Sequence, residues 1–197
     1  MGDGEHGMTS PRVRLEKITG QNHDAVCALR VHPAQELFVS SVAQSLHEAA
    51  ATPEAEPWYR AIYSGDEPVG FVMLGWNVSP GRPGLIGPYF LWKLLIGQHH
   101  QRRGFGREAL TQIIDLVRAD GGTELLTSYQ PGDGEPWPFY QEFGFQPTGE
   151  IHDGEIILRL ELSSRWACAH KLRSLLPPAG AQKPTPLLIV RSSALCG

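Results

Sequence analysis

The sequence predicts an α/β (α+β) fold in which helices flank a mixed, mostly antiparallel sheet of six or seven strands. Hairpin patterns stand at 58–76 and 145–162, and hairpins build antiparallel sheet. Between them, "PYFLWKLLI" at 88–96 is almost continuously apolar and bounded by Gly and Pro, which favours a central strand buried on both faces. A long amphipathic helical pattern then begins at Gly104 and Gly106. Strands and helices therefore share one core.

The N-terminal part of the domain predicts one strand and two helices. "RVRLEKIT" at 12–19 alternates apolar and polar residues, as a strand does, with a core side made by Val13, Leu15 and Ile18. "NHDAVCALRV" predicts a short helix with Asn22 as its N-cap. "SLHEAAAT" predicts a second helix that starts at Ser45, where Glu48 completes a capping box.

The elements that follow alternate between strands and helices. "WYRAIY" and "PVGFVMLGW" flank the polar turn "SGDE" and predict two antiparallel strands. The long helix carries one apolar stripe and ends at "DGG", and its stripe consists of Ala109, Leu110, Ile113, Ile114 and Val117. "TELLTSY" predicts a strand, "PWPFYQEF" a short helix with prolines in its first turn, and 145–162 a closing hairpin around "HDGE".

The chain divides into three parts by composition. We expect residues 1–11 to form a flexible leader and residues 12–162 to form the folded domain. Residues 163–197 are basic and contain several prolines, so we expect a poorly ordered tail. No apolar run is long enough for a membrane helix, and the first residues lack the features of a signal peptide. We therefore expect a cytoplasmic protein with no membrane partner. Three widely spaced cysteines predict neither disulfides nor a metal site.

Charge is distributed unevenly along the chain. Residues 163–197 hold five Lys or Arg and no acid, so 1–162 carry 12 basic and 21 acidic groups, a net charge of −9. An acidic domain disfavours nucleic acid as a partner and is compatible with a cationic substrate.

The junction "QRRGFG" has the features of an anion site. An apolar strand leads into a glycine loop that opens a helix, and such a loop directs free N–H groups and the positive end of the helix dipole at one point. The Walker A pattern is absent, so a nucleoside triphosphatase is disfavoured. "GFGREA" also fits the dinucleotide fingerprint, which leaves a dinucleotide-binding oxidoreductase as an alternative. The hairpins around it and the lack of repeated βαβ units count against that alternative.

Two motifs together resemble the GNAT N-acetyltransferase superfamily. "QRRGFG", from Gln101 to Gly106, matches the acetyl-CoA motif of that superfamily, and "FYQEFGF", from Phe139 to Phe145, matches its downstream signature. The resemblance covers 12–162 and implies a GNAT fold with splayed central strands. "YFLWKLLI", "LLTSYQPGDGEP" and "FQPTGEIHDGEIILRL" look, more narrowly, like bacterial members related to the spermine/spermidine acetyltransferases.

The resemblance implies which residues bind acetyl-CoA. The backbone N–H groups that would cradle its pyrophosphate belong to Gln101, Arg102, Arg103, Gly104, Phe105, Gly106 and Arg107. Backbone groups of Leu94, Leu95 and Ile96 would pair with the pantetheine arm. Asp133 stands where many relatives have an Asn that contacts CoA.

Tyr140 matches the tyrosine that serves as general acid in the family. Attack of an amine on a thioester expels a thiolate, which a positioned phenol can protonate. The strand from Tyr89 to Gly97 contains no carboxylate that could act as base. Glu36, in the loop between the first two helical segments, is the candidate for binding a cationic amine. His99 and His100 lack a matching set of ligands, so we expect no metal.

These observations predict an acetyl-CoA-dependent N-acetyltransferase that acts on a primary amine by direct attack in a ternary complex. The narrower resemblance makes a polyamine or other small cationic amine the leading acceptor, and the family is compatible with a homodimer. The alternative from another class is a non-catalytic acyl-CoA-binding regulatory module. Such a module would keep the cofactor cleft but would have lost the ability to transfer the acyl group to an acceptor.

Overall fold

The computed structural model describes residues 12–36, 38–79 and 84–162. It confirms the predicted fold class, a mixed, mostly antiparallel sheet flanked by helices. The predicted leader (1–11) and tail (163–197) lie outside the described residues. None of the helices in the described part of the chain is both long and apolar enough to cross a membrane.

The sheet has seven strands in the order β1-β2-β3-β4-β5-β7-β6, and only the β4–β5 pair is parallel. The strands are β1 Arg14–Glu16, β2 Pro57–Ser64, β3 Glu67–Trp76, β4 Tyr89–Ile96, β5 Glu124–Tyr129, β6 Gln146–His152 and β7 Glu155–Glu161. The α-helices are α1 His23–Cys27, α2 Val42–Ala51, α3 Phe105–Ala119 and α4 Trp137–Gln141. Three 3-10 turns accompany them, η1 Pro33–Gln35, η2 Pro53–Ala55 and η3 Gln98–His100.

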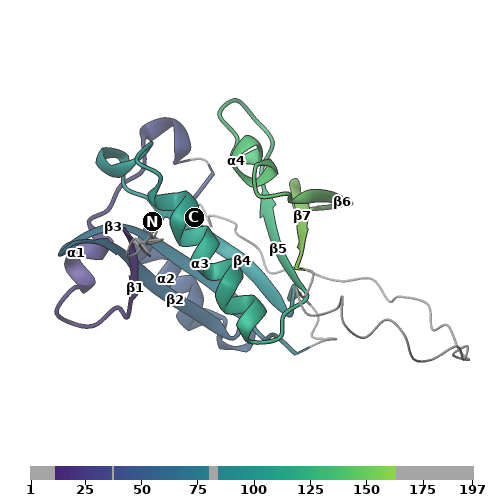
Figure 1. The fold of residues 1–197 in the computed structure, drawn as a ribbon, viewed down its shortest axis with the longest axis horizontal. Helices are drawn as coiled ribbons and strands as arrows, with labels where there is room; N and C mark the ends of the chain where they lie inside the picture. Colours follow the sequence, from purple (N-terminus) through teal and green to yellow (C-terminus); the bar gives the residue numbers. More distant parts are fainter. Residues whose placement is uncertain (1–11, 37, 80–83, 163–197) are drawn as a thin grey trace, which may run out of the picture.

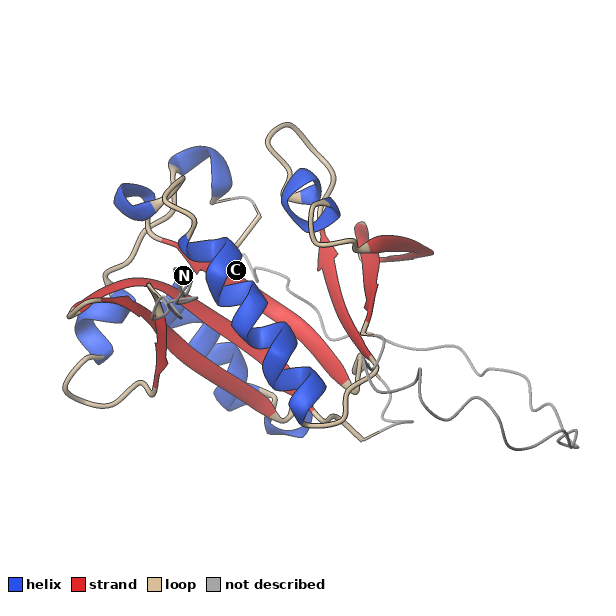
Figure 2. Cartoon of the chain, in the orientation of Figure 1, coloured by secondary structure: helices blue, strands red, loops and turns tan. Residues whose placement is uncertain are grey.

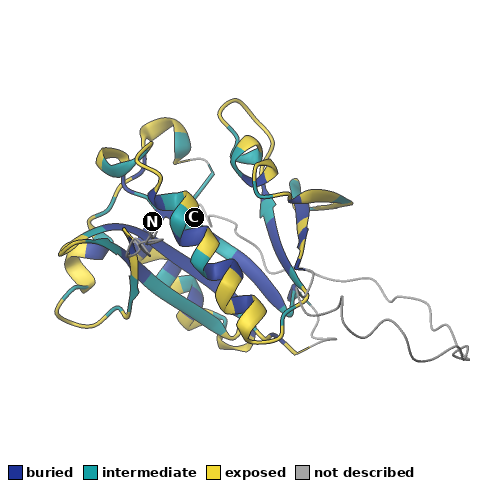
Figure 3. Cartoon of the chain, viewed as in Figure 1, coloured by how far each residue is buried: buried dark blue, intermediate teal, exposed yellow. Residues whose placement is uncertain are grey.

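Helices cover both faces of the sheet (Figures 1 and 2). The apolar stripe predicted for α3 is buried against one face, and Figure 3 shows both buried and exposed residues along this helix. α1 and α2 pack on the other face, where Val26 and Val42 join Phe71 and Leu95 of the sheet. β3 and β4 are thus covered on both sides, which explains why their sequences are almost continuously apolar.

The start of α2 differs from the prediction. Its N-cap is Ser41, whose Oγ accepts a hydrogen bond of 3.2 Å from the N–H of Gln44. Ser45 lies inside the helix and donates its hydroxyl proton back to the carbonyl of Ser41. The prediction of a helix start at Ser45 was wrong because two serines four residues apart are both acceptable caps. Val42 is fully buried, so a helix that begins after Ser41 packs one more turn against the sheet than a helix that begins at Ser45.

The pairing of β4 is irregular on both of its edges. β4 pairs with β5 only at Phe90↔Leu126 and Leu91↔Thr127, and beyond these pairs the strands diverge, as Figure 1 shows. On its other edge β4 contains a bulge in which Trp92 is the extra residue opposite β3. A bulge rotates the side chains that follow it, so Trp92 and Lys93 both point to the α2 face.

Candidate active site

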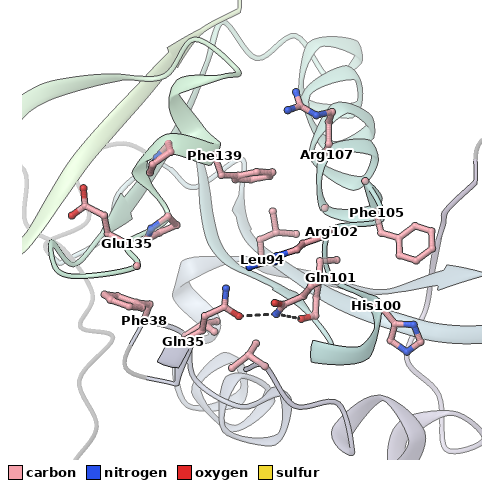
Figure 4. A pocket seen from close by; sticks show the side chains of 18 residues that line it. Gln35, Phe38, Leu94, His100, Gln101, Arg102, Phe105, Arg107, Glu135 and Phe139 are labelled. Atoms are coloured by element: carbon pink, nitrogen blue, oxygen red, sulfur yellow. Dashed lines mark hydrogen bonds between the residues drawn. The ribbon is translucent and has the colours of Figure 1, made fainter. Parts of the chain in front are cut away.

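A cleft of about 540 Å³ lies where the C-terminal end of β4 meets the N-terminal end of α3. One wall comes from η1 and the segment after it, and the opposite wall from the β5–α4 loop and α4 (Figure 4). The residues that form it are mostly apolar or carry the glycine motif. They are Val31, Gln35, Phe38, Val39, Leu94, Ile96, His100, Gln101, Arg102, Gly104, Phe105, Gly106, Arg107, Gly134, Glu135, Pro136, Pro138 and Phe139.

The glycine loop turns sharply into α3. Gly104 is the N-cap of the helix with φ 85°, and Arg102 is also left-handed with φ 59°. The first hydrogen bond of the helix runs from the N–H of Glu108 to the carbonyl of Gly104, over 3.0 Å. The N–H groups before Glu108 therefore have no acceptor within the helix, and an anion can bind there.

The space beside this loop fits a phosphate-bearing group. A Cβ built on Gly106 would lie 3.4 Å from Ile96 Cγ1 and 3.9 Å from the Phe139 ring, between the two walls of the cleft. A Cβ on Gly104 would lie 2.6 Å from the guanidinium of Arg12. Gly106 thus leaves open the space between the two walls, whereas a side chain at Gly104 would meet Arg12, which is not among the lining residues.

Four arginines surround the loop in different ways. Arg102 and Arg107 line the cleft, and Arg107 also pairs with Glu142. The guanidinium of Arg103 lies over the Phe105 ring, 6.0 Å from its centroid, and is not among the cleft residues. Arg12 stacks on the same ring at 5.8 Å. No sequence pattern indicated Arg12, because its place beside Gly104 depends on how β1 packs against α3.

The predicted pantetheine strand contributes two of its three side chains. Leu94 and Ile96 line the cleft, whereas Leu95 is buried on the α2 face. The amide of Gln101 donates to the Ile96 carbonyl over 2.9 Å and to Gln35 Oε1 over 2.6 Å. Figure 4 shows these bonds crossing the floor of the cleft, so Gln101 connects the glycine loop to both β4 and η1.

Tyr140 is buried, and its hydroxyl is hydrogen-bonded to the hydroxyl of Thr127. Thr127 in turn donates to the carbonyl of Leu91 over 2.9 Å. Burial raises the pKa of Tyr140 to about 12, while the bond to Thr127 lowers it and the charge of Glu155 raises it. The phenol therefore stays protonated at neutral pH, at the residue pair where β4 and β5 part.

Besides Leu95 and Arg103, three predicted site residues are not among the lining residues of this cleft, namely Tyr140, Glu36 and Asp133. Glu36 caps the C-terminal end of η1 and is exposed, although Gln35 and Phe38 on either side line the cleft. Asp133 is also exposed and is not among the lining residues. Glu135 is the carboxylate that lines the cleft among the described residues, and its Oε2 accepts from the N–H of Gly132 over 3.0 Å.

A buried ion pair joins β4 to α2. The Lys93 ammonium lies 3.3 Å from Glu48 Oε2 and donates to Ser40 Oγ over 3.3 Å. The side chain of Lys93 is 3% exposed and that of Glu48 is 17% exposed, so the charges are largely withdrawn from water. Sequence reasoning missed this pair, although a single lysine inside an apolar strand was a usable signal.

Within the described residues, no group of three or more His, Cys, Asp or Glu side chains is arranged to hold a metal ion. The features present are instead a glycine loop at a helix N-terminus, a parted pair of parallel strands and a buried neutral phenol that contacts β5 at the last pair before the strands part. Such a site suits a donor that carries both a phosphate and an acyl group.

Comparisons with known proteins show which family has this architecture. The family model "Acetyltransferase (GNAT) family" matches residues 23–145. The chain belongs to this family, and acetyl-CoA is its acetyl donor.

Among curated proteins, the chain is 27% identical over 152 residues to a Bacillus subtilis subsp. natto protein described as "Probable spermine N(1)-acetyltransferase". The match covers 76% of this chain and 99% of that protein.

Solved structures with the same fold are more distant in sequence. An acetyltransferase from Thermus thermophilus superimposes with a TM-score of 0.59 at 20% identity, covering 76% of this chain and 97% of that one. The PaiA N-acetyltransferase from Thermoplasma acidophilum, solved in complex with coenzyme A, gives 0.55 at 11% identity, with 76% and 98% covered.

Proposed function

We propose that the protein transfers the acetyl group of acetyl-CoA to a polyamine or another small cationic amine by direct attack in a ternary complex. The observation that carries the proposal is the position of the Tyr140 hydroxyl beside Thr127, where β4 and β5 part. The similarity to a probable spermine acetyltransferase and the acidic character of 1–162 favour a cationic acceptor.

The chain binds the donor mainly through its backbone in this proposal. The free N–H groups from Gln101 to Arg107 hold the pyrophosphate, and Arg102 adds positive charge. Past Leu91, β4 has no β5 partner. Backbone groups of Leu94, Leu95 and Ile96 are thus the ones that pair with the pantetheine arm. Acetyl-CoA supplies the activated acyl group and a thiolate leaving group.

Tyr140 serves as the general acid. Its raised pKa keeps the proton on the phenol, so the group is ready to donate to the departing sulfur. Thr127 and Phe145 hold the ring, the former through its hydroxyl and the latter through an edge contact with centroids 5.4 Å apart. Asp133 and Glu36 remain predictions as CoA-binding and amine-binding residues, and their exposed positions give them no contact with this cleft.

The test is release of free CoA thiol from acetyl-CoA against a panel of spermidine, spermine, simple diamines, aminoglycosides, amino acids and short peptides. Turnover with polyamines or diamines above the other classes is the expected result. Selective turnover of peptides or amino acids would overturn the acceptor class. Silence across the panel with acetyl-CoA still bound would favour the regulatory module.

A further inference from the structure

Ser128 is the first β5 residue beyond the last pair with β4. Its hydroxyl donates a hydrogen bond to Glu155 Oε2, on the first residue of β7. Side chains alternate across a strand, so Ser128 lies on the sheet face opposite to Thr127. The Glu155 carboxylate therefore stands where β4 and β5 part, on the face away from α3.

The surroundings of Glu155 suit an alkylamine. On the same face, Phe90, Leu126, Ile157 and Ile86 form a buried apolar cluster against which Trp92 packs. Glu155 itself is half-buried at the border of this cluster. An ammonium group can contact the carboxylate while its alkyl chain lies on the apolar side chains.

Glu155 and Tyr140 also interact electrostatically. Tyr140 reaches Thr127 from the α3 face, yet the charge of Glu155 contributes to its raised pKa. Tyr140 contacts Thr127 and Glu155 contacts Ser128, so the two groups lie on opposite faces of β5 at neighbouring residues, where β5 has parted from β4. One is a neutral acid and the other a carboxylate, which is the pair of groups that acyl transfer to an ammonium requires.

We propose that Glu155 binds the ammonium group of the acceptor at this gap and accepts its proton, an inference that rests on the proposed acetyl transfer. Glu155 takes one proton, and the freed lone pair forms the C–N bond to the thioester carbon as the C–S bond breaks. Tyr140 gives its proton to the departing sulfur and recovers the second proton from the nitrogen. Glu155 then returns its proton to solvent, so the net products are the acetylated amine, CoA thiol and one proton.

Other titratable groups near Glu155 define the controls. His152 is its direct partner across the β6–β7 hairpin, and Asp153 lies in the turn between them. A purely structural role, in which Ser128 and Glu155 merely tie β5 to β7, would change stability and leave the pH dependence of the rate unchanged.

The experiment compares Glu155→Gln with Glu161→Gln, a matched change at an exposed site on the same strand. For an amine that the wild type acetylates, kcat/KM at pH 7 should fall about 100-fold in E155Q. The loss should shrink as the pH approaches the pKa of the free amine, because solvent then removes the proton. E161Q should match the wild type, and His152→Gln identifies any part of the pH profile that belongs to the imidazole. A loss in E155Q that is equal at all pH values, or no loss, would overturn the role.

A binding measurement decides the same question without turnover. Calorimetry of spermidine on the CoA-loaded protein should show at least tenfold weaker binding to E155Q, with CoA affinity unchanged. Equal affinity of the accepted amine for both proteins overturns the proposal. If the wild type acetylates a different amine, only the acceptor class is refuted, and that amine replaces spermidine in the binding measurement.

Discussion

Thr127 and Leu91 form the last backbone pair between β5 and β4, and the Thr127 hydroxyl closes that pair with a 2.9 Å bond to the Leu91 carbonyl. Every group assigned to chemistry lies near this point. Tyr140 meets Thr127 on one face and Glu155 meets Ser128 on the other. In the proposed mechanism, the pair therefore marks the place where donor and acceptor come together.

Replacing Tyr140 with Phe tests the general acid. Turnover should fall by roughly 100-fold to 10,000-fold, the usual range for a positioned proton donor. The ring and its packing remain, so the affinity for CoA measured by calorimetry should not change. Tyr63→Phe, on β2 and remote from the gap, is the control. An acetylation rate that survives Y140F would show that another group protonates the sulfur.

Because the pKa of Tyr140 is raised in the folded state, the free energy of unfolding should fall as the pH becomes alkaline. The unfolded tyrosine ionises near 10 and the folded one near 12. Its stabilising contribution is thus complete below pH 10 and is lost as pH rises from 10 to 12, by roughly 2 to 3 kcal/mol. Urea unfolding at several pH values should show a smaller decline in Y140F than in wild type. Tyr89, whose pKa burial and Asp120 also raise to about 12, should maintain part of the decline.

Gly106 offers a steric test of the donor site. Val at this position would extend into the space between Ile96 and Phe139, and we expect at least a tenfold loss of CoA affinity, about 1.4 kcal/mol. Gly106→Ala adds only one methyl group at ordinary contact distance and raises helix propensity, so it should bind CoA nearly as well. Equal binding of CoA to both variants would mean that the donor does not pass between these walls.

Lys93 and Glu48 can be tested by a double-mutant cycle. Lys93→Met leaves a buried carboxylate without its cation, which typically costs about 3 to 5 kcal/mol. Combining it with Glu48→Gln removes the second charge and should recover most of that loss. Denaturant unfolding measures each variant. If the losses in unfolding free energy of the two single variants simply add in the double variant, the two charges do not stabilise each other.

The sequence predicted those parts of the fold that depend on local pattern. The α3 stripe from Ala109 to Val117 and the glycine entry at Gly104 are short-range features, and the structure confirms both. The cap of α2 was misassigned because Ser41 and Ser45 are locally equivalent, and only packing of Val42 distinguishes them.

The acceptor side could not be predicted in the same way. The residues that we propose to hold the donor are close in sequence, from Leu94 to Arg107, whereas Ser128 and Glu155 meet only through strand pairing. The bulge at Trp92, which sends Lys93 toward Glu48, has no sequence signature of its own. Long-range pairings of this kind require the folded structure.

The sheet consists of two parts, β1 to β4 and β5 to β7, which are joined by only two residue pairs between β4 and β5. Residues of both parts, among them Tyr89, Leu125 and Phe145, are buried in one cluster. We expect that a change of side-chain volume at these positions widens or narrows the gap between β4 and β5. Such a change would alter which acceptors enter, while the strand pairing within each part of the sheet stays the same.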